Sequence, residues 1–225
     1  MLDWLFGPQC AACGASATTL CDGCTATLVE LGPACPRCAD PGTGAVCRRC
    51  VVDPLPLAQI VSPWKFGGQL ASAIRRLKFS GTTHIARDVA PLWAPLIAAV
   101  VRTHDAVVVP VPLHWRRRMT RGFDHTWLLA KHACAAAKLR APSPALARVR
   151  GAPAQSTLSA DERRANLSDA FAVRNVSSIT GRAVVLVDDV VTTGATLAAA
   201  ARPLRLAGAT AVYGVSLARA TSTLL

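Results

Sequence analysis

Residues 184–197 have the sequence VVLVDDVVTTGATL, and this stretch decides the fold. Its first four residues are aliphatic, which is typical of a strand buried on both faces of a parallel sheet. The segment 195–208, ATLAAAARPLRLAG, has the pattern of a helix that Pro203 kinks. The stretch therefore predicts a strand, a short loop and a helix. Asp188 and Asp189 would stand at the carboxyl end of the strand, where open α/β sheets bind their ligands.

The loop between this strand and helix has the chemistry of an anion cradle. Its residues are Thr192, Thr193, Gly194, Ala195 and Thr196. Threonine hydroxyls and the N–H groups at the start of a helix donate hydrogen bonds to phosphate, and glycine lets the backbone approach closely. The two carboxylates beside the loop accept hydrogen bonds from vicinal hydroxyls. The segment therefore predicts a site for a ribose 5-phosphate, which presents both groups.

A strand that ends in two aspartates is also typical of the Walker B element of ATPases. The sequence has no G-x-x-x-x-G-K-[ST] phosphate loop, which argues against an ATPase of that kind. A solvated acidic loop capped by threonines is the purely structural alternative. It is disfavoured because two adjacent carboxylates repel one another when no ligand or metal offsets their charge.

Strands and helices alternate along residues 58–225. Extended segments are predicted at 57–66, 106–112, 183–189 and 211–218, and helices at 67–79, 85–103, 125–139 and 195–208. Pro91 and Pro95 should interrupt the second of these helices. Such alternation is typical of an α/β fold with a doubly wound parallel sheet, closed here by the last strand. We expect residues 58–225 to form one domain and residues 1–57 another.

Eight of the nine cysteines form four Cys-x-x-Cys knuckles within residues 10–50. The knuckles are Cys10/Cys13, Cys21/Cys24, Cys35/Cys38 and Cys47/Cys50. This spacing predicts two structural zinc sites with four cysteine ligands each, which leaves no open position for a catalytic water. Sequential pairing gives two short ribbons, a crossed pairing stays open, and disulfides are the alternative to metal. We expect the metal to supply the folding energy of this short segment.

Composition and charge narrow the class of protein. The chain is 52% hydrophobic and 17% charged, as globular proteins are. Residues 1–57 hold three basic and five acidic side chains and are therefore net negative, so residues 58–225 carry more than the whole formal charge of +12, and we expect anionic ligands there. The apolar run 89–101 contains two prolines and is too short to span a bilayer. Because the first residues lack the regions of a signal peptide, we expect a cytoplasmic protein.

The segment DDVVTTGAT resembles the diphosphoribosyl signature of type I phosphoribosyltransferases. The likeness extends along nearly the whole chain, through the cysteine knuckles and three further segments. These are LKF-G (77–81), VPVPLHWRRRMTRGF (109–123) and RVRGAPAQSTLSADERRANLSDAF (148–171). Together they resemble the ComF family of competence-associated proteins. The resemblance implies a phosphoribosyltransferase-like parallel sheet with an N-terminal zinc-ribbon subdomain.

The resemblance also implies roles for single residues. Asp188 and Asp189, the candidate catalytic residues, would hold the ribose 2- and 3-hydroxyls, and loop 192–196 would cradle the 5-phosphate. A loop containing Arg117 and Arg121 would hold pyrophosphate together with Mg²⁺, since guanidinium groups suit its oxygens.

One residue of that loop departs from the family pattern. Relatives commonly have R-G-F-N-Q where this chain has RGFDH over residues 121–125. Asp124 would place a negative charge where pyrophosphate is expected. Because hard cations prefer oxygen ligands, we hypothesise that Mg²⁺ bridges the two and that ligand binding depends strongly on Mg²⁺.

The polar stretch 150–169 is similar to the flexible loop that closes over the site in phosphoribosyltransferases. The implied ligand contacts are Arg148, Gln155, Arg163 and Asn166. Such a lid would exclude water from a developing oxocarbenium ion. The alternative is a disordered polar connection with a short helix at 160–167.

Three functions compete at this point. The resemblance implies a protein that binds phosphoribosyl diphosphate and takes part in DNA uptake, natural transformation and the handling of single-stranded DNA, together with other competence proteins. An active phosphoribosyltransferase acting on a nucleobase-like or other nitrogen acceptor is the second, but no base-recognition motif is legible in residues 1–66, its expected hood. The third is a zinc-dependent protein-interaction module, which would need neither Asp188 nor Asp189.

Overall fold

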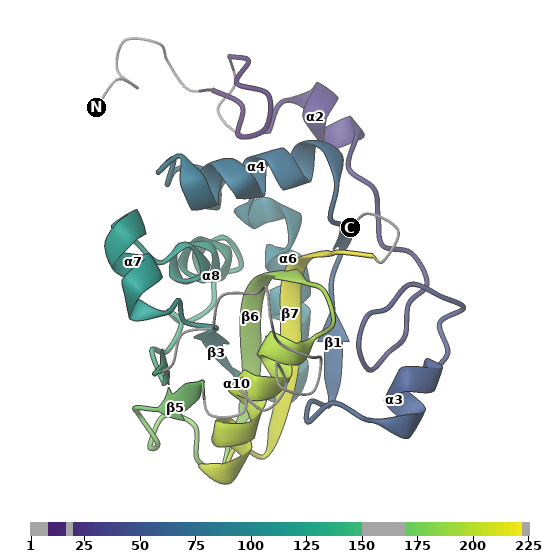
Figure 1. Ribbon diagram of the computed structural model, residues 1–225, viewed down its shortest axis with the longest axis vertical. Coiled ribbons are helices and arrows are strands. Elements are labelled where there is room, and N and C mark those ends of the chain that lie inside the picture. The colour runs from purple at the N-terminus through teal and green to yellow at the C-terminus, as the bar shows by residue number, and fades with distance from the viewer. Residues whose placement is uncertain (1–8, 17–19, 150–169, 222–225) are drawn as a thin grey trace, which may run out of the picture.

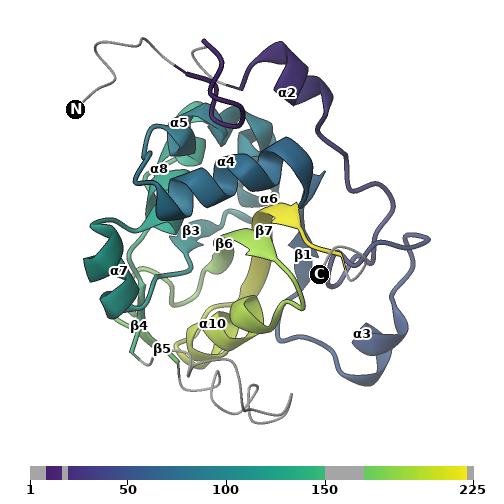
Figure 2. The ribbon, with the colours of Figure 1, turned by 45° about the horizontal axis from the view of Figure 1, so that its top comes forward.

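The computed structural model describes residues 9–16, 20–149 and 170–221, and it describes the backbone but not the side chain of Arg117. Within these residues a parallel sheet carries helices on both faces, and the cysteine-rich segment lies outside the sheet (Figures 1 and 2). The predicted α/β class is therefore confirmed.

The centre of the sheet is β6, Ala183–Val191, the strand expected from the aliphatic run. β6 pairs in parallel with β3 (Val107–Pro110) on one side and with β7 (Ala211–Arg219) on the other. Because all three strands run the same way, their carboxyl ends meet at one edge of the sheet, with Asp188 and Asp189 near the end of β6.

Two short strands extend the sheet beyond β7. β1 (Gln59–Val61) and β2 (Trp64–Lys65) both pair in parallel with β7, and the strand order is β1-β7-β6-β3. The expectation that β7 closes the sheet is therefore wrong, since β7 is an interior strand. Residues 59–65, expected within the hood, belong to the sheet instead.

Helices cover both faces because side chains alternate along β6. Val184 and Leu186 pack in the cluster that contains α10 (Ala195–Leu206), and Val185 and Val187 pack in the opposite cluster. The helices of that second layer are α4 (Gly68–Phe79), α5 (Ile85–Asp88), the 3-10 helix Ala90–Leu92, α6 (Ala94–His104) and α8 (His125–Ala136). In the described part of the chain, none of the helices has the length and apolar character needed to cross a membrane.

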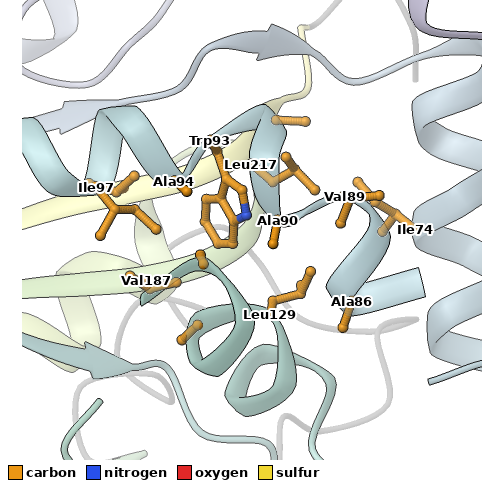
Figure 3. Close-up of a cluster of buried hydrophobic side chains, with 14 of the residues drawn as sticks. Ile74, Ala86, Val89, Ala90, Trp93, Ala94, Ile97, Leu129, Val187 and Leu217 are labelled. Atoms are coloured by element: carbon orange, nitrogen blue, oxygen red, sulfur yellow. The ribbon is translucent and has the colours of Figure 1, made fainter. Parts of the chain in front are cut away.

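Trp93 lies at the centre of the second layer. Its side chain is 0% exposed and packs among Ile97, Leu129, Val187 and Leu217 (Figure 3). Ile74 of α4 and Leu129 of α8 belong to the same cluster, so this core fixes both helices relative to the end of β6. The positions of α4 and α8 matter because both helices carry side chains of the candidate site.

Two smaller elements flank the end of β3. The segment expected as a pyrophosphate-binding loop is instead a helix, α7, spanning Trp115–Arg121. Arginine and methionine are good helix formers, which explains the difference. A separate antiparallel pair joins β4 (Leu146–Arg148) to β5 (Phe171–Val173), so the two strands that flank the expected lid lie beside one another.

The cysteine-rich segment contains two ribbons that dock at different places. The first ribbon, with α2 (Asp22–Ala26), lies against α4, where Arg76 donates to the carbonyls of Cys10 and Ala11. The second, with α3 (Arg48–Val52), lies beside β1, where the Ile60 N–H donates to the carbonyl of Arg37. Figure 2 shows α2 near α4 and α3 on the side of β1.

Candidate phosphoribosyl site

The two adjacent aspartates of β6 lie in different surroundings because neighbouring side chains of a strand point to opposite faces. Asp189 is only 4% exposed and faces the layer of α4 and α8. Asp188 is half-buried, and the positive charge of Arg148, at the end of β4, acts on it. The pair therefore stands at the carboxyl edge with one member held by the second helix layer and the other more accessible.

Asp189 is held by a cation and a histidine. Its Oδ2 lies 2.5 Å from Lys78 Nζ of α4 and 2.9 Å from His125 Nε2 of α8, and its Oδ1 accepts a 2.7 Å hydrogen bond from the Val190 N–H. Burial raises the pKa of Asp189, but the bond from His125 and the charge of Lys78 outweigh it, so the pKa lies well below its usual range. Asp189 is a carboxylate at neutral pH.

Asp188 titrates in the opposite direction. Burial and the neighbouring charge of Asp189 raise the pKa of Asp188 to about 8, although Lys78 and Arg148 partly offset them. Its Oδ1 accepts a 2.9 Å hydrogen bond from the Asp189 N–H. Without a ligand, the pair therefore carries close to one negative charge at neutral pH, because two adjacent buried carboxylates do not both ionise readily.

The contacts of His125 fix its tautomer. Arg121 Nη1 lies 3.3 Å from Nδ1 of this ring, and a guanidinium can only donate hydrogen bonds. Nδ1 must therefore accept, which places the proton of a neutral ring on Nε2, directed at Asp189. The result is a chain of contacts from Arg121 through His125 to Asp189 and Lys78.

The loop after β6 leaves N–H groups available at the start of α10. Gly194, the N-cap residue of the helix, has a φ of +81° and, as a glycine, has no side chain that could cap the helix. The Ala195 N–H donates to Thr193 Oγ1 at 3.3 Å. Thr192 and Thr193 are exposed, so this loop lies at the surface beside the positive end of the helix, which is the end that favours anions.

The structure brings together several of the residues expected from the sequence. The aspartates and loop 192–196 are contiguous, Arg121 joins them through His125, and Arg148 acts on Asp188. Arg117 lies in α7, but the structure does not describe its side chain. The expected contacts Gln155, Arg163 and Asn166 lie outside the described residues.

Asp124 has a different role from the one expected. Its Oδ1 accepts hydrogen bonds of 3.1 Å from the N–H groups of Thr126 and Trp127, and its Oδ2 accepts one of 3.0 Å from Leu113. It is therefore the N-cap of α8, and it also ties that helix to the chain after β3. The structure thus gives the Asp124 carboxylate a capping role, and the expected bridge through Mg²⁺ to pyrophosphate stays a prediction.

Two residues of the site were missed from the sequence. Neither Lys78, which lies in the LKF-G segment, nor His125, which ends the RGFDH segment, is assigned a site role by the sequence patterns. His125 is in fact 4% exposed and contacts Asp189. The available signal was the L-K-F-x-G segment, whose lysine comes from a helix with an apolar face at Leu70, Ile74 and Leu77. That face docks α4 on the core and directs the end of the helix toward the site.

The cysteines form two four-sulfur sites with sequential pairing. One contains Cys10, Cys13, Cys21 and Cys24, and the other contains Cys35, Cys38, Cys47 and Cys50, with all ligand atoms of each set within 4.8 Å of one another. The sulfurs of Cys13 and Cys21 are 3.8 Å apart, and those of Cys38 and Cys47 are 3.6 Å apart. Tetrahedral zinc with bonds of about 2.3 Å places two sulfurs about 3.8 Å apart, so both sites fit zinc.

Backbone donors prepare the first cysteine of each site for metal. The N–H groups of Cys21 and Cys47 donate at 3.3 Å to the sulfurs of Cys10 and Cys35 respectively. Burial raises the pKa of these two thiols, but the backbone donors outweigh it and bring each pKa to about 6. That favours the thiolate, which is the form that binds zinc.

Comparison with known proteins agrees with this arrangement. A double zinc ribbon domain matches residues 1–51, and a phosphoribosyl transferase domain matches residues 135–224. DNA utilization protein YhgH of Escherichia coli K12 is 34% identical over 199 residues, which cover 86% of this chain and 87% of that protein. The chain belongs to the ComF family. Competence protein F of Haemophilus influenzae is 30% identical over 89% of this chain and 90% of its own length, and competence protein ComFC of Bacillus subtilis is 32% identical over 82% and 77%.

The candidate site combines residues inside the phosphoribosyl transferase match with residues that precede it. The phosphoribosyl transferase match includes the aspartate pair and the anion loop, whereas Lys78 and Arg121 come from residues before that match. The sheet strands β1 and β3 also precede it. In this ComF chain, elements that lie before residue 135 and outside the match thus complete the candidate site.

Proposed function

We propose that this ComF protein binds phosphoribosyl diphosphate at the carboxyl edge of its sheet and serves DNA uptake or utilisation. The observation that supports it best is the position of Asp189, which Lys78 and His125 hold at the end of β6, one short loop before the N-terminus of α10. A carboxylate beside an anion cradle matches a vicinal diol beside a phosphate. The relatives are named for competence and DNA utilization, which supports the biological setting.

Each end of the ligand has partners of suitable charge. Asp188 and Asp189 would accept hydrogen bonds from the ribose hydroxyls, and loop 192–196 would donate to the 5-phosphate. Arg121 would face pyrophosphate, with Mg²⁺ bridging its oxygens. The remaining proposed ligand contacts are Arg117, Arg148, Gln155, Arg163 and Asn166. Zinc would be held by the eight cysteines and would fold the ribbons, apart from the ligand chemistry.

We test this by calorimetric titration of the zinc-loaded protein with phosphoribosyl diphosphate and Mg²⁺. The double variant Asp188→Asn, Asp189→Asn should bind at least about 100-fold more weakly, because each charge-assisted hydrogen bond contributes about 1.5–3 kcal/mol. Asp105→Asn is the matched control, since that exposed aspartate precedes β3 at the amino edge of the sheet, opposite the edge with Asp188. Unchanged affinity in the double variant would contradict the proposal.

A basic and aromatic surface favours single-stranded nucleic acid as a second ligand. Trp115, Met119 and Phe79 are 52%, 74% and 74% exposed. Arg116 lies 5.2 Å from the Trp115 ring and Arg121 lies 4.9 Å from the Phe79 ring. Exposed aromatic rings interleaved with arginines suit stacked bases and a phosphate backbone.

A competition experiment tests whether single-stranded DNA and phosphoribosyl diphosphate bind to overlapping sites. Because Arg121 contacts both Phe79 and His125, a bound strand should weaken phosphoribosyl diphosphate binding if the two ligands share this arginine. The measurement is the affinity of a short oligodeoxynucleotide, with its salt dependence, in the presence and absence of phosphoribosyl diphosphate. Pyrophosphate release that depends on an added nitrogen acceptor would instead support the transferase alternative. If a protein partner bound the double aspartate variant as tightly as the wild-type protein, that result would support the zinc-dependent protein-interaction module.

Two further proposals concern organisation and location. We divide the chain into a zinc-ribbon part, residues 1–57, and a phosphoribosyltransferase-like part, residues 58–225. A cytoplasmic location is supported by the nine cysteines, all in described residues, none of which forms a disulfide, because unpaired cysteines persist in reducing compartments.

A further inference from the structure

Leu55 touches both the second four-cysteine site and the anion loop. It follows α3, the short helix that carries Cys50, and packs against the cluster of Cys35, Cys38 and Cys50. The same side chain also packs in the core cluster of α10. This partly buried leucine therefore contacts both the second metal site and the core around α10, the helix that follows the anion loop.

The contact with the loop is close at Gly194. A Cβ placed on this glycine would lie 2.9 Å from Cδ1 of Leu55 and 3.2 Å from Cδ1 of Ile60. Only glycine fits a backbone with a φ of +81° under these two methyl groups. Leu55 and Ile60 thus hold the peptide that precedes the first N–H groups of α10.

The second ribbon is also fixed at the neighbouring strand. Asp40, two residues after Cys38, pairs with Arg219 at 2.8 Å, and this arginine is only 1% exposed. Arg219 lies in register with Val191, the last residue of β6 before the loop. Asp40 itself is partly exposed, but loss of its carboxylate would leave the buried charge of Arg219 without this partner, so the position of the ribbon and the end of the sheet depend on each other.

The first four-cysteine site has different neighbours. Cys10 and Cys24 pack in the cluster of α4 and α8, and Arg76 binds the first knuckle. In the described ranges, the close approach to Gly194 comes from Leu55 and Ile60, not from the first ribbon. An effect of metal on the loop should therefore come from the second site.

We propose that zinc in the second site and a phosphoribosyl ligand in the anion loop stabilise each other's binding, with Leu55 as the positioning residue between them. Metal holds the Cys35–Cys50 segment in the geometry that presses Leu55 on Gly194, and that contact keeps the loop in its phosphate-binding shape. This inference rests on the proposed function. Coupling between two sites is reciprocal, so bound ligand must also retain zinc in the second site.

The direct test measures the zinc affinity of the wild-type protein. A zinc-selective chromogenic chelator is titrated to equilibrium with and without saturating phosphoribosyl diphosphate and Mg²⁺. We expect the ligand to raise the apparent zinc affinity of one site of the two by roughly 2–30-fold, the range that modest coupling between sites gives. Equal zinc affinities of both sites with and without ligand would overturn the inference. The double variant Asp188→Asn, Asp189→Asn controls for chelation of zinc by the ligand itself and should show no such gain in zinc affinity.

Variants then test Leu55. Leu55→Ala should weaken phosphoribosyl diphosphate binding by roughly 2–30-fold and remove the gain in zinc affinity, whereas Leu55→Met should retain both because it conserves volume. Leu28→Ala is the matched control, since Leu28 is a partly buried leucine packed against the cluster of the first site. Wild-type ligand affinity and a wild-type gain in zinc affinity in Leu55→Ala would refute the positioning role. If the wild-type protein itself fails to bind the ligand, the proposed function fails first, and calorimetry separates the two outcomes.

Discussion

Asp188 and Asp189 are neighbours in sequence but point to opposite faces of one strand. Asp189 contacts Lys78 of α4 and His125 of α8, and these contacts hold the two helices at the end of β6. Asp188 retains a raised pKa because burial and the neighbouring charge of Asp189 outweigh the positive charges of Lys78 and Arg148. At the residue scale, one carboxylate stabilises the site and the other stores unfavourable charge that a ligand or metal can relieve.

Opposite effects on stability should follow from this difference. The folded pKa of Asp188, about 8, exceeds its unfolded value, so its ionisation weakens folding as the pH rises through about 8. The folded pKa of Asp189 is depressed, so its contribution is present above 3.8 and is lost as the pH falls toward the folded pKa.

The measurement is thermal unfolding of the ligand-free protein at pH 6 and pH 9. Asp188→Asn should raise Tm at pH 9, by about 2–4 °C per kcal/mol in a chain of this size, and the gain should shrink at pH 6. Asp189→Asn should lower Tm at both pH values, because it leaves Lys78 without its buried partner. A lower Tm for Asp188→Asn at pH 9 would show that its carboxylate is not destabilising.

At the scale of elements, α8 is placed by its first residues. Asp124 caps the helix and binds the Leu113 N–H, and the next residue, His125, contacts Asp189. The cap therefore sets the start of α8 one residue before a side chain of the site. A change at the cap should act on the helix first and on ligand binding through it.

Substitutions at Asp124 separate cap from charge. Asp124→Ala should lower the free energy of unfolding by about 0.5–2 kcal/mol, and Asp124→Asn by a smaller amount, because asparagine also caps helices. Urea denaturation measures both. The Mg²⁺ dependence of phosphoribosyl diphosphate binding should be the same in Asp124→Asn as in the wild type. A loss of that dependence in Asp124→Asn would restore the metal-bridging role that the sequence suggested.

Local patterns predicted the elements better than the contacts between them. The strand, loop and helix around residues 184–197 are contiguous, so periodicity and loop chemistry were enough to place them. Lys78 and His125 reach Asp189 from α4 and α8, and their convergence depends on packing around Trp93 that no local pattern encodes. Asp124 was interpreted by its charge, although an aspartate before a helical segment is also a cap signal.

At the scale of the whole molecule, arginines join the ribbons to the sheet domain. Arg76 binds the first ribbon from α4, and Arg219 binds the second from the end of β7. Buried residues of both ribbons, such as Ala11 and Ala39, belong to the two main core clusters. The cysteine-rich segment is thus packed into the same cores as the sheet, and its metal sites support surfaces beyond themselves.

Removal of zinc should therefore loosen residues 10–50 before the sheet. Without metal, each ribbon lacks most of its folding energy, because the segment is short and rich in turns. Hydrogen exchange followed by mass spectrometry should show loss of protection in residues 10–50 while β3 and β6 stay protected, and added zinc should restore it. Unchanged protection of residues 10–50 in metal-free protein would mean that packing alone folds the ribbons.

The place of β7 inside the sheet has a consequence for biosynthesis. β1 finds its hydrogen-bonding partner only when β7 has been made, and Asp40 meets Arg219 across 179 positions of chain. Domains that wait for distant segments expose unpaired edges during translation. The ribbons emerge from the ribosome early and can take up metal at once, but the second one stays undocked until nearly all of the described chain exists. Metal supply during translation would then influence how much nascent protein escapes aggregation.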